Sequence, residues 1–69
     1  MAEIITTHSL LLNDILYNIG DVIPVVKYVD ETGEDWELRK AEITNITEEY
    51  VEFVSQGGIY IVPEYKIQE

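Results

Sequence analysis

The sequence predicts an all-β fold, and two observations support this prediction. Hydrophobic residues make up 46% of the 69-residue chain, too many for a disordered segment, and many are the β-branched and aromatic types that favour strands. Residues 20–42 contain a β-branched run, an acidic turn with one glycine, and a second run that opens on the only tryptophan, an order typical of a β-hairpin. A chain this short buries about 60% of its unfolded surface. We therefore expect one domain, residues 1–69, with a small core.

The first 18 residues, which we assign to an N-terminal arm and a first strand, fit two interpretations. Their apolar runs, at 4–5, 10–12 and 15–17, follow neither helical nor strand spacing cleanly. A short helix capped by Thr7 or Ser9 is one interpretation. We favour short strands with a turn at Asn13-Asp14, and irregular chain around them, followed by a second turn at residues 18–21.

The central hairpin is expected to pair residues 22–29 with residues 36–46, across an acidic turn at 30–35. Pro24 donates no backbone hydrogen bond and is therefore expected at an edge, at a bulge or at the start of the strand. In the second strand, Ala41 and Ile43 alternate onto one face, whereas Trp36 and Leu38 share the opposite face. If Ala41 and Ile43 face the core, Trp36 and Leu38 lie on the outer face.

The C-terminal third contains three further predicted strands. A turn at residues 47–49 leads into a strand at 50–54, in which Val51 and Phe53 are expected to point inward. Residues 55–58 contain two glycines and are expected to form a flexible loop. A strand at 59–62 is then interrupted by Pro63, and Ile67 anchors a short last strand.

Three segments resemble SH3-like small barrels. Residues 14–23, DILYNIGDVI, resemble the acid, leucine, aromatic and Gly-Asp stretch that precedes an SH3 strand. Asp35-Trp36, after an acidic loop, resembles the start of the SH3 strand that opens with tryptophan, and residues 62–67, VPEYKI, resemble the closing segment. The resemblance implies a five-stranded SH3-like small barrel, with an N-terminal arm or short helix, of a bacterial or phage type.

The same resemblance implies a set of surface residues. Trp36, Pro63 and Tyr65 match positions that carry the proline-rich ligand in SH3 domains. Residues 4–13 supply no aromatic side chain other than His8, so half of that groove is missing, and Arg39 stands where the family has a small alanine. We therefore do not expect polyproline binding of the eukaryotic kind.

The charge of the chain restricts its partners. Fourteen acidic residues against four basic ones give a net charge of -10, which disfavours direct binding to nucleic-acid phosphates. Five acids gather around the central turn: Asp30, Glu31, Glu34, Asp35 and Glu37. They suit a solvated loop tip, and their spacing lacks the alternation of a calcium loop. Together with Glu42, Glu48, Glu49 and Glu52 they could instead imitate nucleic-acid phosphates for a basic protein.

Nothing in the sequence indicates catalysis. The chain has no cysteine and a single histidine, and its serines lie in expected loops, so no nucleophile, base and orienting group can be assembled. We expect no enzyme activity, no cofactor and no metal. The lack of cysteine, of a targeting segment and of an apolar run near 20 residues predicts a cytoplasmic protein that does not enter a membrane.

The leading functional hypothesis is a protein-interaction module. Trp36, Leu38, Pro63 and Tyr65 are expected to form a partly apolar patch, rimmed by acids, that engages a basic or amphipathic protein. Trp36 could equally pack across the end of the barrel, and Pro63 with Tyr65 could simply close the fold. One alternative function is an acidic, phage-type inhibitor that occupies the nucleic-acid site of another protein. A second is a subunit that joins a larger assembly through an unpaired edge strand.

Overall fold

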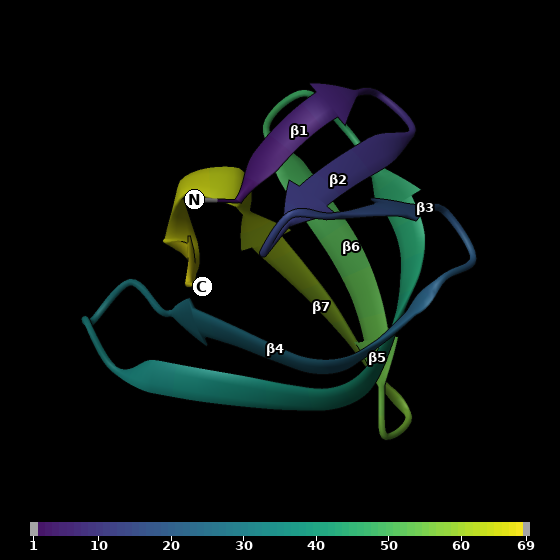
Figure 1. The fold of residues 1–69 in the computed structure, drawn as a ribbon. Coiled ribbons are helices and arrows are strands. Elements are labelled where there is room, and N and C mark those ends of the chain that lie inside the picture. The colour runs from purple at the N-terminus through teal and green to yellow at the C-terminus, as the bar shows by residue number, and fades with distance from the viewer. Residues whose placement is uncertain (1, 69) are drawn as a thin grey trace.

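The computed structural model describes residues 2–68, which form two antiparallel sheets (Figure 1). The N-terminal sheet has the order β1-β2-β3 and the larger sheet the order β7-β6-β5-β4-β8. The all-β prediction is confirmed, but the described strands do not close into one barrel. Within residues 2–68, no helix has the length and apolar character needed to cross a membrane. The strands are β1 (Glu3–Thr6), β2 (Ser9–Leu12), β3 (Ile15–Asn18), β4 (Val22–Val29), β5 (Asp35–Ile46), β6 (Tyr50–Ser55), β7 (Gly58–Pro63) and β8 (Ile67–Gln68), with a 3-10 turn, η1 (Glu64–Lys66), before β8.

The N-terminal region consists of strands, so the helical alternative is wrong. Leu12 pairs with Ile15 across a two-residue turn at Asn13-Asp14, and both turn residues have positive φ, 52° and 64°. Asparagine and aspartate tolerate this left-handed conformation, which the tight hairpin turn requires. The turn was predicted at this place, whereas the additional strand β1 was not.

The N-terminal sheet supplies part of the hydrophobic core. In Figure 1, β1 and β2 lie across the upper ends of β6 and β7. Leu10 and Leu12 are 0% and 3% exposed, and they belong to the same buried cluster as the larger sheet. The cluster comprises Ala2, Leu10, Leu12, Ile23, Val26, Leu38, Ala41, Ile43, Ile46, Val51, Phe53, Val62 and Ile67. Residues 2–18 are therefore an integral part of the fold.

The β4–β5 hairpin is kinked where Pro24 faces Lys40. Register pairs flank this point on both sides, Ile23 with Ala41 and Val25 with Arg39, whereas Pro24 and Lys40 themselves are not paired. Lys40 has a φ of 51°, which breaks the regular strand conformation. A local kink of this kind re-aims the side chains on either side of it.

The kink changes which alternate residues of each strand face the core on its two sides. On β4 the buried residues are Ile23 and Val26, and on β5 they are Leu38 and Ala41, three positions apart in each case. The expectation that Leu38 lies on the outer face is therefore wrong, because strict alternation does not continue through Lys40. Leu38 is 5% exposed and belongs to the core.

The β6–β7 hairpin is more regular than the sequence suggested. Ser55 pairs with Gly58 across a two-residue turn, Gln56-Gly57, and both turn residues have positive φ. The expected flexible loop is thus a tight hairpin turn. Val51 and Phe53 are both fully buried, as predicted.

The chain ends by returning to β4. Tyr28 pairs with Ile67 and Lys27 with Gln68, so β8 extends the sheet on the side away from β5. Ile67 is 7% exposed and anchors this strand, as the sequence predicted. The return brings η1 and the end of β7 close to the end of β4.

Candidate interaction groove

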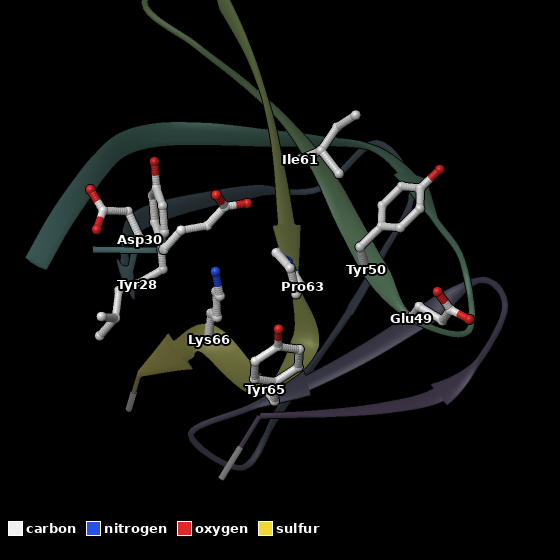
Figure 2. A pocket seen from close by; sticks show the side chains of 10 residues that line it. Tyr28, Asp30, Glu49, Tyr50, Ile61, Pro63, Tyr65 and Lys66 are labelled. Carbon is white, nitrogen blue, oxygen red and sulfur yellow. The ribbon is translucent and has the colours of Figure 1, made fainter. Parts of the chain in front are cut away.

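A groove of about 480 Å³ lies where the end of β4, the β5–β6 turn, the end of β7 and η1 meet (Figure 2). Its lining comes from both halves of the chain, brought together by the pairing of β8 with β4 and of β7 with β6. The lining residues are Tyr28, Val29, Asp30, Glu31, Glu49, Tyr50, Ile61, Pro63, Tyr65 and Lys66. We call this site the groove below.

Three tyrosines, one proline, one valine and one isoleucine form the apolar part of the groove. Tyr50 pairs directly with Pro63 in the β6–β7 register, so their side chains share the outer face of the sheet. Figure 2 shows Tyr28 and Tyr50 on either side of Pro63, with Tyr65 on the adjoining turn. Tyr65 is 83% exposed. A tyrosine side chain this exposed contributes little to the core and is available for contact with a partner.

Acidic side chains dominate the charge of the groove. Its lining contains the carboxylates of Asp30, Glu31 and Glu49 and one ammonium group, that of Lys66, which leaves two net negative charges. The Lys66 ammonium nitrogen lies 6.0 Å from the centroid of the Tyr65 ring, at the outer limit of a cation–π contact. The groove is thus aromatic, acidic and open to solvent.

Asp30 organises the turn at one wall of the groove. Its Oδ1 accepts hydrogen bonds from the Thr32 hydroxyl at 2.6 Å, the Thr32 amide at 2.8 Å and the Glu34 amide at 3.0 Å. Its Oδ2 accepts a hydrogen bond from the Trp36 indole at 2.7 Å. The Thr32 side chain first, and then Trp36, hold the pKa of Asp30 well below its usual value. Asp30 is therefore a fixed negative charge.

Tyr28 is a neutral phenol, and its pKa is shifted in the direction opposite to that of Asp30. Burial raises the pKa of its hydroxyl, and Tyr60 and Asp30 raise it further because a negative charge on either group would repel a phenolate. A neutral hydroxyl can donate a hydrogen bond to a ligand, whereas a phenolate could only accept one. The groove therefore offers a donor beside its carboxylates.

The residues expected to form the binding patch do not all meet. Pro63 and Tyr65 line the groove. Trp36 is 46% exposed and lies outside the lining, to which it is linked by its hydrogen bond to Asp30. Leu38 is buried in the core and cannot contribute to a surface patch.

The five acids expected to form one surface take different roles. Asp30 and Glu31 line the groove, whereas Asp35 and Glu37 belong to a separate hollow beside Trp36. Glu37 pairs with Arg39 at 2.9 Å, and Glu34 is exposed on the turn. Across residues 2–68, no group of three or more histidine, cysteine or acidic side chains is placed to hold a metal ion.

Sequence reasoning missed five groove residues: Tyr28, Val29, Tyr50, Ile61 and Lys66. Tyr28 packs partly against the core and also lines the groove. The available signal was the hairpin register, because counting outward from the turn at residues 56–57 places Tyr50 opposite Pro63.

No protein-family model, curated protein or solved structure matches this chain.

Proposed function

We propose that this protein is a non-enzymatic interaction module whose groove binds a basic, extended segment of a protein partner. The observation that carries the proposal is the convergence of tyrosines, a proline and carboxylates in one open groove. Aromatic rings and carboxylates together suit arginine and lysine, because a guanidinium group can stack on a ring while it pairs with an acid.

The apolar part of the groove sets a second requirement on the partner. Ile61 is 58% exposed and lies on the same strand as Pro63. An apolar side chain of the partner can therefore bury apolar surface against both residues. Basic residues alone would leave this surface uncovered. We therefore propose a segment in which basic and apolar residues alternate.

We also propose that the larger sheet is a divergent, open version of the SH3-like fold. Its strands β4 to β7 follow one another as antiparallel neighbours, and β8 returns after the 3-10 turn to pair with β4. This order supports the proposal. Pro63 ends β7 and Tyr65 lies in the 3-10 turn that follows it, the segment for which the resemblance implies ligand contacts. Because the chain has no cysteine, we place the module in a reducing, cytoplasmic compartment.

The second candidate, a mimic of nucleic-acid phosphates, is favoured by one observation. The turn between β4 and β5 extends away from the rest of the ribbon in Figure 1 and carries exposed acids. Such a mimic must compete with DNA or RNA for its partner, and its binding must weaken as salt screens the charges. A ternary complex of this protein, its partner and the partner's nucleic acid would exclude it.

The groove is tested by calorimetric titration with two synthetic octapeptides, one alternating valine and arginine, the other alternating valine and glutamate. We expect binding of the basic peptide only. Tyr65→Ala should weaken that binding by roughly tenfold, equivalent to about 1.4 kcal/mol. Because Tyr65 is so exposed, this variant should keep the unfolding midpoint of the parent.

The matched control is Ile15→Ala on β3, which removes a 53% exposed apolar side chain that does not line the groove. It should bind the basic peptide as the parent does. Equal affinity for the two peptides, or unchanged affinity in Tyr65→Ala, would contradict the proposal.

A further inference from the structure

Strand β7 is an uncharged and unprotected sheet edge. It is the outermost strand of the larger sheet, and its sequence, GIYIVP, contains no acidic or basic residue. Ile59 is 70% exposed and Ile61 is 58% exposed. Soluble proteins normally protect an edge strand with charged side chains, bulges or an interior proline, because its free backbone groups attract another strand. On β7 the only such device is Pro63, at the very end.

The register shows which backbone groups of β7 face the open edge. Ser55 and Gly58 flank the two-residue turn, and in such hairpins the flanking pair exchanges both backbone hydrogen bonds. Bonded and non-bonded pairs then alternate, so the bonded pairs are at Gly58, Tyr60 and Val62. The amide and carbonyl groups of Ile59 and Ile61 therefore point away from β6, toward the open edge.

The same two residues lead into the groove. Their side chains lie on the outer face of the sheet, where Ile59 pairs with Val54 and Ile61 pairs with Glu52. Ile61 also lines the groove, and in Figure 2 it lies on the ribbon just beyond Pro63. An extended segment laid along β7 would thus continue from the edge into the groove without a change of direction.

Charge selects the occupant of this edge. Residues 50–63, which include both strands, contain no lysine or arginine. Two acids lie on the face of Ile59 and Ile61: the half-buried Glu52, directly opposite Ile61, and Glu42, opposite Val54. A basic segment is attracted to these carboxylates, whereas a second copy of this chain, with its net charge of -10, is repelled.

We infer that the basic segment binds as an added strand along β7, hydrogen-bonded to the backbone of Ile59 and Ile61 and directed into the groove. This inference rests on the proposed function and specifies its binding mode. Main-chain bonds supply affinity in such complexes, and alternate side chains supply selectivity. Here the apolar side chains of the segment, which share one face, cover Ile59 and Ile61, and the positive charge of the segment is attracted by the carboxylates of Glu52 and Glu42.

Amide hydrogen exchange, followed by NMR on the ¹⁵N-labelled protein, tests the added strand with the valine-arginine octapeptide. At saturation, exchange of the Ile59 and Ile61 amides should slow by at least about tenfold, because opening then requires loss of the peptide. Leu16 is the matched control. It has the same outward position on the β3 edge, next to a two-residue turn, and its amide should exchange at an unchanged rate.

A side-chain variant distinguishes the contribution of the β7 edge to peptide binding from that of the groove. Ile59 does not line the groove, so Ile59→Arg places a repelling charge on the edge alone. It should weaken binding of the basic peptide by roughly tenfold. Ile15→Arg adds the same charge to an exposed position of β3 and should have little effect, which controls for the change in net charge.

The results distinguish failure of this inference from failure of the proposed function. A peptide whose binding is weakened by Tyr65→Ala, but which leaves the Ile59 and Ile61 amides unprotected, would overturn strand addition and leave the groove proposal intact. Absence of binding by the basic peptide would overturn both. Protection of these amides that increases with protein concentration, without peptide, would show that a second copy covers the edge and would overturn the inference.

Discussion

The indole N–H of Trp36 donates a 2.7 Å hydrogen bond to Oδ2 of Asp30, across the turn that joins β4 to β5. The Asp30 side chain thereby connects the turn backbone, through the amides of Thr32 and Glu34, to the only tryptophan of the chain. All of these bonds favour the ionised carboxylate. The conformation of Trp36 and the charge of Asp30 are therefore coupled.

This coupling predicts a dependence of stability on pH. The folded-state pKa of Asp30 lies below its ordinary value of 3.8. The stability that the carboxylate contributes is therefore complete above pH 3.8 and is lost as the pH falls below it, toward the folded-state pKa. Urea unfolding, followed by Trp36 fluorescence at pH values from about 6 to about 2.5, should show a smaller acid-induced loss in Asp30→Asn than in the parent. Glu34→Gln, in the same turn, serves as control and should retain the parental dependence. Equal acid-induced losses in Asp30→Asn and in the parent would contradict the role of Asp30.

Trp36 and Leu38 are predicted to differ in their effect on stability, although they are two residues apart on one strand. Leu38 is 5% exposed, and Leu38→Ala should lower the free energy of unfolding by about 2–5 kcal/mol. Trp36 is 46% exposed, and Trp36→Ala should cost less than about 2 kcal/mol. Urea denaturation followed by circular dichroism compares the two variants on one scale. A larger loss for Trp36→Ala than for Leu38→Ala would place the indole in the core.

Leu38 also shows where sequence reasoning failed. The strand boundaries at residues 22–29 and 36–46 were predicted to within one residue, because β-branched runs and the acidic turn mark them clearly. The side chains of β5 that face the core were not predicted correctly, because alternation was assumed to continue along the whole strand. A lysine at positive φ has no sequence signature, and Pro24 marks the kink only once its register partner is known.

The groove was predictable only in part, for a related reason. Pro63 and Tyr65 were identified from a local motif, and both line it. Tyr28 and Tyr50 join them through long-range pairing, of β8 with β4 and of β7 with β6, which no local pattern specifies. The short apolar runs of residues 4–17 were ambiguous because each is too brief to show a period.

The kink at Lys40 predicts an unusual stabilising substitution. Lys40 has a φ of 51°, a conformation that costs a side chain with a Cβ atom about 1–2 kcal/mol, whereas glycine adopts it freely. After subtraction of the extra entropy that glycine loses on folding, Lys40→Gly should raise the free energy of unfolding by about 0.5–1 kcal/mol. Lys27→Gly, at an exposed position of β4 that pairs regularly with Glu37, should instead lower it. A loss of stability in Lys40→Gly would show that the lysine side chain supports the kink.

The contribution of the N-terminal sheet to the core is tested by two adjacent leucines of β2. Leu10 is completely buried against the larger sheet, whereas Leu11 points to the other face and is half-buried. Leu10→Ala should lower the free energy of unfolding by about 2–5 kcal/mol, because it leaves a cavity between the two sheets. Leu11→Ala removes the same atoms from a partly solvated site and should cost roughly half as much or less. Denaturant unfolding should show a single transition in both variants, since the buried cluster spans both sheets. Equal losses, or a separate early transition for residues 2–18, would mean that the N-terminal sheet folds independently of the larger one.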